Sequence, residues 1–314
     1  MISFLEFERP VAQLEAQIKE LRATAEDGAV DISAELVRLE TKSAAMLAEI
    51  YGSLTPWQKT QVARHPSRPH LRDYIAETFE DFVPLGGDRL YGDDQAILGG
   101  FARLDGRKIM LIGHEKGNDT ESRLQHNFGM GKPEGYRKAI RLIDLAGRFG
   151  LPVVTLIDTS GAFPGVEAEE RGQAEAIARS TEACLAATVP LISVIVGEGG
   201  SGGAVALASA DRVLMLEHAV YSVISPEGCA SILWRTAEKA PDAAQAMKVT
   251  AADLKRLNVI DRIIDEPVGG AHRDPRMMAA TLAKVLTDEL TLLDDMTGDD
   301  IRRKREERFL AIGA

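Results

Sequence analysis

The stretch Gly197-Glu198-Gly199-Gly200-Ser201-Gly202-Gly203 decides the fold, because it follows an apolar run at 191–196 and precedes a short helical pattern that ends near Ala210. Five glycines in seven positions do not stabilise a helix, since each costs roughly 1 kcal/mol relative to Ala. Glycine instead permits positive φ and close approach of a second backbone. The stretch therefore predicts a buried strand followed by a glycine loop that opens a helix.

An earlier part of the chain repeats this order. A strand is predicted at 153–158, a loop at 159–165, and a helix from there to about Thr188, and a third strand is predicted at 212–216. Near-continuous apolar strands with helices between them are typical of an α/β fold with a buried, largely parallel sheet. Active sites in such sheets lie beyond the carboxyl ends of the strands, so we expect both loops to line one crevice.

The flanking chain predicts further helices and strands. Asp105-Gly106 between the apolar runs 97–104 and 107–112 indicates a hairpin, and a last strand is predicted at 259–264. Helix starts are predicted at three positions, namely Thr55-Pro56, Ser225-Pro226 and Thr250. Closing helices are predicted at 275–295 and 299–312; the second is heavily charged, and we expect it to face solvent.

The first 50 residues predict a helical hairpin. Val11, Leu14, Ile18 and Leu21 recur at helical spacing, Asp27-Gly28 interrupts the pattern, and a stripe with coiled-coil spacing follows at 32–50. This apolar stripe packs either on the main domain or on a partner subunit, and the sequence favours neither. We expect an N-terminal helical region at 1–80 and a main domain at 81–314.

Composition argues against several classes of protein. The 314 residues carry a formal net charge of −11 and a sequence pI of about 5.2, which disfavours general binding to nucleic acid or to an anionic membrane. Cys184 and Cys229 are the two cysteines, so we expect neither a disulfide framework nor a thiolate metal cluster. No apolar run approaches a membrane span, and the acidic N-terminus does not resemble a signal peptide. We expect a cytoplasmic location.

The glycine stretch at a helix start indicates a site for negative charge. The first N–H groups of a helix have no intrahelical partner and lie at the positive end of its dipole. If the charge develops only during a reaction, the same donors form an oxyanion hole, for example one that serves an acyl thioester. The alternative without chemistry is a tight turn that lets strand and helix pack.

Two further kinds of site match the same residues. Residues 197–202 satisfy G-x-G-x-x-G of dinucleotide-binding loops, with Glu217 as the ribose-binding acid, but the following helix is short and a second nucleotide-binding half is lacking. Residues 199–203 satisfy G-x-S-x-G, with Ser201 as the nucleophile. Partners for Ser201 would come from Asp211, His218 and His272, whose order in the chain gives no particular support.

Other residues carry weaker signals. Asp158 ends a buried strand, and we expect it to cap the following loop rather than act as a base. Lys248 lies in a sequence similar to a biotin attachment site, but the residues before it predict a helix, which excludes that role. Six basic residues either face solvent or meet a phosphate or carboxylate: Arg123, His126, Lys132, Arg137, Lys138 and Arg141.

Several motifs in order resemble one family. The glycine stretch 197–204, the earlier loop 159–165 and the segment 169–173 resemble the alpha subunits of the carboxyltransferase of multi-subunit acetyl-CoA carboxylases. The segments 127–130, 133–139 and 221–230 resemble them too, and the resemblance extends over nearly the whole chain. The family commonly has Pro and Tyr where this chain has Ser160 and Phe163.

The resemblance implies a crotonase-like fold, a superhelix of ββα units with an N-terminal helical extension and C-terminal helices. It implies transfer of the carboxyl group of carboxybiotin, held by a separate biotin carboxyl carrier protein, to acetyl-CoA, which gives malonyl-CoA for fatty acid synthesis. It also implies a beta subunit in an alpha-2 beta-2 heterotetramer and a biotin carboxylase. The beta subunit is expected to hold acetyl-CoA and a structural zinc, with no covalently bound cofactor and no metal on this chain.

The resemblance further implies roles for single residues. Gly202 and Gly203 are expected to donate backbone N–H groups to the ureido oxygen of carboxybiotin. Further residues are expected to bind substrate or shape its approach: Gly199, Gly200, Ser201, Gly161, Ala162 and Phe163. A pure scaffold role, with all chemistry on the partner, is the alternative.

Overall fold

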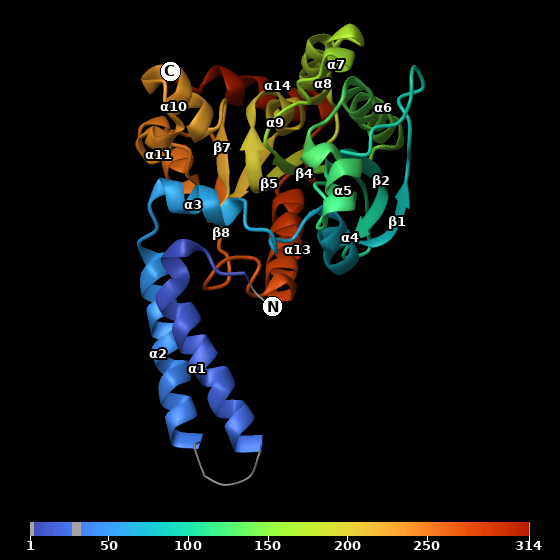
Figure 1. Cartoon of the computed structure of the whole chain (residues 1–314). Coiled ribbons are helices and arrows are strands. Elements are labelled where there is room, and N and C mark those ends of the chain that lie inside the picture. Colours follow the sequence, from blue (N-terminus) through green and yellow to red (C-terminus); the bar gives the residue numbers. More distant parts are fainter. Residues whose placement is uncertain (1–2, 27–32, 314) are drawn as a thin grey trace.

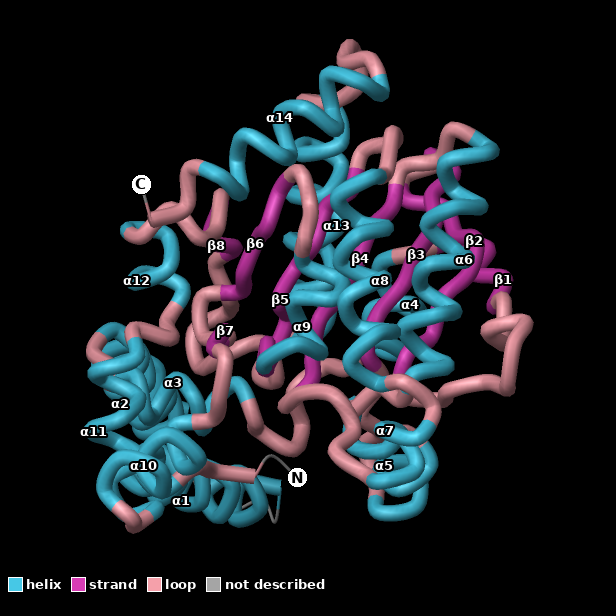
Figure 2. The backbone as a smooth tube through the Cα atoms, turned by 90° about the horizontal axis from the view of Figure 1, so that it is seen from above, coloured by secondary structure: helices cyan, strands magenta, loops and turns pink. Residues whose placement is uncertain are grey.

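A mixed sheet of eight strands forms the centre of the computed structural model, which describes residues 3–26 and 33–313 (Figures 1 and 2). The strand order is β1-β2-β3-β4-β5-β6-β8, and β7 pairs with β5. The strands are β1 Glu80–Pro84, β2 Ile97–Leu104, β3 Arg107–His114, β4 Val153–Thr159, β5 Leu191–Gly200, β6 Arg212–Leu216, β7 Val220–Ser222 and β8 Arg262–Ile264.

The sheet is antiparallel at one edge and parallel elsewhere. β2 and β3 form the predicted hairpin, in which Leu104 pairs with Arg107 across a turn where Gly106 has a φ of 73°. From β3 through β4, β5 and β6 to β8 every pairing is parallel. All residues of β4 and β5 are buried, as their continuous apolar sequence predicts. The expected parallel α/β sheet is thus confirmed.

Helices cover both faces of this sheet. A Cβ on Gly99 of β2 would meet Leu142 of α6, whereas a Cβ on Gly113 of β3 would meet Leu71 of α4. Gly113 pairs with Leu98, the neighbour of Gly99, and successive residues of a strand point to opposite faces. The helices α4 and α6 therefore lie on opposite faces.

Fourteen α-helices occur in the described parts of the chain. They are α1 Arg9–Glu26, α2 Ser33–Gly52, α3 Pro56–Ala63, α4 Leu71–Thr78, α5 Thr120–Gln125, α6 Pro133–Phe149, α7 Val166–Glu170, α8 Gln173–Ala186, α9 Ser201–Ala208, α10 Pro226–Trp234, α11 Ala240–Met247, α12 Ala251–Arg256, α13 Pro275–Thr291 and α14 Gly298–Leu310. The predicted starts of α3, α10 and α12 are confirmed, with Thr55, Ser225 and Thr250 as side-chain caps. None of these helices is long and apolar enough to cross a membrane.

The helices α1 and α2 form the predicted hairpin, which extends away from the body in Figure 1. Its apolar stripe packs within the hairpin itself, where Leu14 and Ile18 of α1 meet Leu39 of α2. Arg273 fixes the base of the hairpin by ion pairs with Glu8 and Glu15. The predicted turn at Asp27-Gly28 lies outside the described residues.

Two predicted boundaries and one predicted solvent exposure are wrong. The helix expected to run to Thr188 is divided into α7 and α8, because Gly172 has a φ of 81° between them. The last strand begins only at Arg262. The helix α14 does not simply face solvent, since Arg305 on its inner side is 1% exposed and forms an ion pair with Asp211.

Candidate active site

The glycine stretch is not a loop, contrary to expectation. β5 continues through Gly200, and α9 begins at the next residue, Ser201. The extension of the strand follows from β7, which pairs with Glu198–Gly200. A Cβ on Gly199 would come within 3.0 Å of the ring of Tyr221 in that strand. Glycine thus allows the sheet to close tightly up to the first turn of the helix.

The two glycine-containing segments lie in direct contact, as predicted. A Cβ on Gly200 would overlap the carbonyl group of Ser160, and a Cβ on Gly203 would come within 2.8 Å of the Gly161 carbonyl carbon. A Cβ on Gly202 would only touch Ile177, at 3.4 Å. The absence of a side chain is therefore strictly required at positions 200 and 203 but not at 202.

The start of α9 offers free donors. Ser201 adopts a φ of 53°, which turns the chain abruptly from strand to helix. No side chain caps this helix, and the N–H groups of Gly202 and Gly203 make no hydrogen bond outside it among the described residues. Because the first N–H groups of a helix lack intrahelical acceptors, these two can serve a ligand oxygen.

The segment after β4 is held in a fixed shape beside this helix. The Thr159 hydroxyl donates to the Gly161 carbonyl at 2.7 Å and accepts from the Gly161 N–H at 3.1 Å. Gly161 has a φ of 149°, which side-chain-bearing residues rarely adopt. The half-buried Ala162 follows, and Phe163 donates its N–H to the Gly131 carbonyl and carries the Lys132 ammonium 4.9 Å from its ring centre. Phe163 is thus held by its backbone hydrogen bond and its ring contact, neither of which needs the hydroxyl group of the tyrosine that is common in the family.

Asp158 joins β4 to β5 instead of capping its own loop, so that prediction is wrong. Its carboxylate accepts the N–H of Glu198 at 2.9 Å and pairs with the Lys116 ammonium at 2.7 Å. Nδ1 of His70 lies 3.3 Å from the same carboxylate. Burial alone would raise the pKa of Asp158, yet Lys116 and His70 bring it well below its usual range. A Cβ on Gly197 would strike this carboxylate, which accounts for the first glycine of the stretch.

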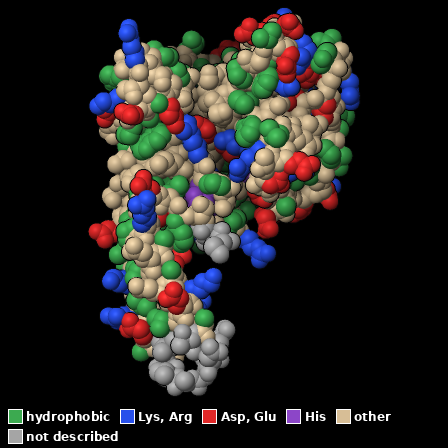
Figure 3. All heavy atoms as spheres, in the orientation of Figure 1, with side chains coloured by type: hydrophobic (Ala, Val, Ile, Leu, Met, Phe, Trp, Pro, Cys, Tyr) green, Lys and Arg blue, Asp and Glu red, His purple; other side chains and the backbone are tan. Residues whose placement is uncertain are grey.

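A cavity of about 230 Å³ opens beside Asp158, at the carboxyl ends of β3, β4 and β5. Figure 3 shows that this face is hollowed, with Lys and Arg side chains gathered in the hollow. The cavity is lined by Ala63, Arg64, His65, Pro66, His70, Lys116, Gly117, Arg123, Phe128, Asp158, Ser160 and Glu198. Gly202 and Gly203 do not line it; Ser160, which lies against Gly200, connects the cavity with the glycine segment.

Several of these residues were not predicted from the sequence. Lys116 follows β3 at its carboxyl end, a position that could have drawn attention to it. Arg64 and His70 come from the chain around α3 and α4, and no sequence signal marks them. Arg64 pairs with Glu198 at 2.6 Å and with Glu227 at 2.6 Å, so tertiary packing alone brings it to the site.

The nucleophile alternative does not fit the structure. Asp211 bonds to the N–H of Leu191, the first residue of β5, whereas Ser201 follows the last. Ten strand residues span about 30 Å, so Asp211 and Ser201 lie at opposite ends of the sheet. His218 and His272 are buried and make no hydrogen bond to Ser201 among the described residues. Ser201 therefore has no base.

The dinucleotide alternative fails for a related reason. The residues that would form a phosphate-binding loop belong to β5, and the N–H of Glu198 is already bonded to Asp158. A carboxylate in that position would repel a pyrophosphate.

In the described residues, no group of three or more His, Cys, Asp or Glu side chains could hold a metal ion.

Most of the basic stretch between 123 and 141 is engaged in structure. Lys132 pairs with Glu167, Lys138 with Asp93, and Arg137 with Asp88. Two others bond to backbone carbonyls, His126 to Gln95 and Arg141 to Leu85 and Gly87. Arg123 differs: it lines the cavity and has no ion pair among the described residues.

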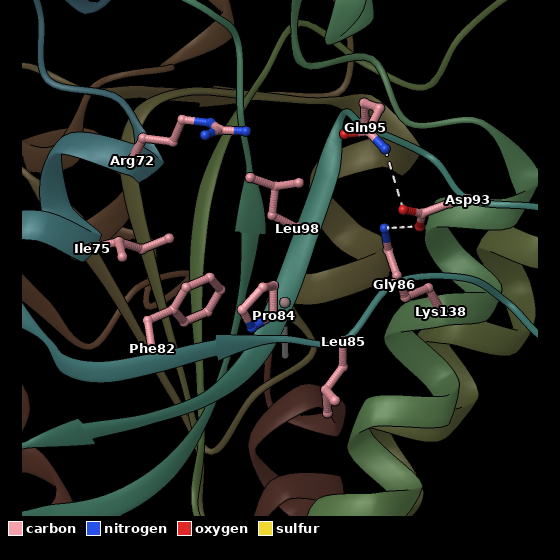
Figure 4. A pocket seen from close by; sticks show the side chains of 11 residues that line it. Arg72, Ile75, Phe82, Pro84, Leu85, Gly86, Asp93, Gln95, Leu98 and Lys138 are labelled. Carbon is pink, nitrogen blue, oxygen red and sulfur yellow. Dashed lines mark hydrogen bonds and ion pairs between the residues drawn. The ribbon is translucent and has the colours of Figure 1, made fainter.

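A larger cavity, of about 410 Å³, lies between α4, β1 and β2 and is shown in Figure 4. Ile75, Phe82 and Leu98 form an apolar side, and Asp93 on the opposite side bonds to Lys138 and Gln95. Of the residues singled out from the sequence, Lys138 lines it, and its ammonium is already paired with Asp93. The free N–H donors of α9 and the buried Asp158 lie away from it, so the smaller cavity at the carboxyl ends of the strands belongs to the candidate active site.

The parallel sheet with its glycine-lined carboxyl edge is the crotonase-like fold that the sequence predicts. The transcarboxylase 12S structure with methylmalonyl-coenzyme A and methylmalonic acid bound superimposes with a TM-score of 0.55 at 24% identity, covering 70% of this chain and 42% of that chain. A family model described as "acetyl co-enzyme A carboxylase carboxyltransferase-like" matches residues 4–313.

Two full-length relatives identify the family more narrowly. The acetyl-coenzyme A carboxylase carboxyl transferase subunit alpha of Erythrobacter litoralis is 76% identical over 313 residues, which cover 100% of each chain. The subunit of the same name from Rhizorhabdus wittichii is 64% identical over 313 residues, again with 100% of each chain covered. The chain belongs to the family of acetyl-CoA carboxylase carboxyltransferase alpha subunits, and it is an enzyme subunit that transfers carboxyl groups.

Proposed function

We propose that the N–H groups of Gly202 and Gly203 donate to the ureido oxygen of carboxybiotin while its carboxyl group passes to acetyl-CoA. Transfer of the carboxyl group away from the ureido nitrogen places negative charge on that oxygen. Preorganised N–H donors stabilise such charge without a titrating side chain. The single observation that carries the proposal is the uncapped start of α9, held against Gly161 at the carboxyl edge of the sheet.

The remaining predicted site residues support these donors. Gly199 and Gly200 allow close packing of β5 against β7 and Ser160, and Ser201 supplies the abrupt turn into the helix. Gly161, Ala162 and Phe163 form the facing wall of the site. Their half-buried positions leave them accessible to a substrate that enters along this edge.

We further propose that the chain acts in the cytoplasm with a beta subunit, as an alpha-2 beta-2 heterotetramer. The relatives' name, subunit alpha, supports a partner subunit. That subunit would hold acetyl-CoA and a structural zinc, and a biotin carboxyl carrier protein charged by biotin carboxylase would deliver the carboxyl group. In this proposal residues 1–80 form the N-terminal helical region, which contributes Arg64 and His70 to the cavity, and residues 81–314 form the main domain.

A matched pair of variants tests the proposal. Gly203→Ala places a methyl group 2.8 Å from the Gly161 carbonyl carbon and must displace one of the two segments, whereas Gly202→Ala meets only Ile177 at 3.4 Å. Removal or misplacement of one oxyanion donor costs on the order of 100- to 1,000-fold. We expect a loss of that size for Gly203→Ala and less than about tenfold for Gly202→Ala.

The measurement is malonyl-CoA-dependent carboxylation of biocytin by the purified complex with the beta subunit. Co-purification with the beta subunit and an unchanged melting temperature serve as controls for folding. Nearly full activity of Gly203→Ala would contradict the proposed donors and favour a scaffold role for this chain.

A further inference from the structure

The cavity beside Asp158 carries an imbalance of charge. Its lining includes three cations and two carboxylates, and two of the cations are matched: Lys116 with Asp158 at 2.7 Å and Arg64 with Glu198 at 2.6 Å. The third cation, Arg123 of α5, is half-buried and has no ion pair among the described residues. Its one hydrogen bond, from Nε to the Gly117 carbonyl, is long at 3.4 Å.

A second polar group on the same cavity also lacks a partner. His70 is 8% exposed, and its Nδ1 is directed at Asp158. Its Nε2 is buried and makes no hydrogen bond. Buried polar atoms in folded proteins are almost always hydrogen-bonded, so the incomplete bonding of His70 and the unpaired Arg123 guanidinium show that the polar groups of this cavity are not all satisfied within the described chain.

Asp119, the N-cap of the same helix, attracts Arg123 electrostatically but forms no ion pair with it in the described part of the chain. Asp119, one turn earlier, directs its carboxylate to the N–H of Ser122 at the start of α5. A guanidinium that retains its donors and is partly withdrawn from water is the usual protein group for a carboxylate or a phosphate.

We propose that this cavity is an anion subsite in which Arg123 binds a carboxylate or phosphate group of one of the enzyme's two substrates. The inference rests on the proposed function, because the cavity reaches the glycine segment through Ser160, which lies against Gly200. Two sources provide this chemistry: the carboxyl group that is transferred, and the phosphates of coenzyme A. Lys116 and Arg64 line the same cavity and add positive potential to it.

Kinetics of the complex with the beta subunit distinguish the sources. Arg123→Gln removes the charge, Arg123→Lys keeps it, and Arg276→Gln removes an exposed cation at the start of α13 as a matched control. We expect Arg123→Gln to lower kcat/KM by about tenfold or more, Arg123→Lys to retain most of it, and Arg276→Gln to equal the wild type.

Comparison of malonyl-CoA with malonyl-pantetheine as carboxyl donor assigns the anion. An equal loss with both donors identifies the transferred carboxyl group, and a loss with malonyl-CoA alone identifies a coenzyme A phosphate. Wild-type rates for Arg123→Gln with both donors would overturn the subsite. The proposed function is tested separately, by the transfer rate of the wild-type complex and by the loss of that rate in Gly203→Ala.

A second measurement does not depend on turnover. Phenylglyoxal labels accessible arginines, and mass spectrometry of the digested complex reports Arg123 and Arg276 separately. We expect inorganic phosphate or malonyl-CoA to slow labelling of Arg123 and to leave Arg276 unaffected. Identical labelling of Arg123 with and without these anions would overturn the proposal.

Discussion

The two ends of β5 carry charged side chains that differ in how completely they are paired within the chain. At the amino end, Arg305 of α14 is fully bonded: its Nε and Nη2 donate to Asp211, and its Nη1 donates to the carbonyls of Cys184 and Ala187. Nη2 also reaches the carbonyl of Val189. Every donor has a partner within the chain, and no cavity adjoins the pair among those described.

The carboxyl end is left incomplete. Asp158, Lys116, Arg64 and Glu198 neutralise one another beside a cavity, while Arg123 has no ion pair and the Nε2 of His70 has no hydrogen bond among the described residues. The difference teaches how to separate structural from functional charge in this fold. Charged side chains whose hydrogen-bond and ion-pair partners all lie within the chain hold the elements together. Charged side chains that lack such partners indicate where a substrate group binds.

The largest expected effect on stability lies at the amino end. Arg305→Met leaves Asp211 and four carbonyl groups without their Arg305 donor in a buried site. Loss of one partner of a buried pair costs about 3–5 kcal/mol. We expect a loss of that size in the free energy of unfolding by urea, with kcat of the folded complex unchanged. A reduced kcat of Arg305→Met under conditions where the variant is fully folded would contradict the purely structural role of the charges at the amino end.

Acid is expected to lower the stability of the protein through a buried histidine at the carboxyl end of the sheet. His114, the last residue of β3, is 1% exposed, and burial lowers its pKa to about 4. Between pH 6.5 and 4 the unfolded chain binds a proton that the folded chain does not, so stability rises with pH in this window and is complete above it. The contribution lost by pH 4 is about 3 kcal/mol.

Urea unfolding at several pH values checks this expectation. His114→Leu, of similar volume, should show a shallower fall in the free energy of unfolding between pH 6.5 and 4 than the wild type. Parallel curves for the two proteins would show that His114 takes no part in the acid response.

A smaller effect on catalysis is expected from Asp158→Asn, the counterpart of Arg305→Met at the other end. The amide keeps the volume of the side chain and can still accept the Glu198 N–H, but it no longer balances Lys116. We expect kcat of the complex to fall about tenfold, equivalent to about 1.4 kcal/mol. Unchanged kcat with a large loss of stability would make Asp158 a structural residue like Asp211.

The smallest effect is expected from Ser201→Ala. The structure gives Ser201 a backbone role, and its φ of 53° disfavours alanine only slightly more than serine. We expect kcat to change by less than about twofold, since the N–H donors of the following residues remain. A serine-directed probe should leave Ser201 unlabelled; covalent labelling together with loss of turnover would restore the nucleophile interpretation.

Much of the fold could be predicted because its signals are local. Continuous apolar runs locate β4 and β5, Asp105-Gly106 marks the β2–β3 hairpin, and capping residues mark the starts of α3, α10 and α12. The predicted ends of elements were wrong where they depend on a contact or a backbone conformation that the local sequence pattern does not reveal. β5 runs through the glycines because β7 pairs with them, and the break before α8 depends on the positive φ of Gly172.

The sequence by itself determined the parallel sheet, the two glycine-containing segments at its carboxyl edge and the family to which the chain belongs, because these depend on residue order and local periodicity. Only the tertiary structure decided which side chains surround that edge. Arg64 and His70 come from one stretch of the chain, and Lys116 and Arg123 come from another about 50 residues later. Their pairing depends on distances in space, and a charge left without a partner is visible only after all the others have been matched.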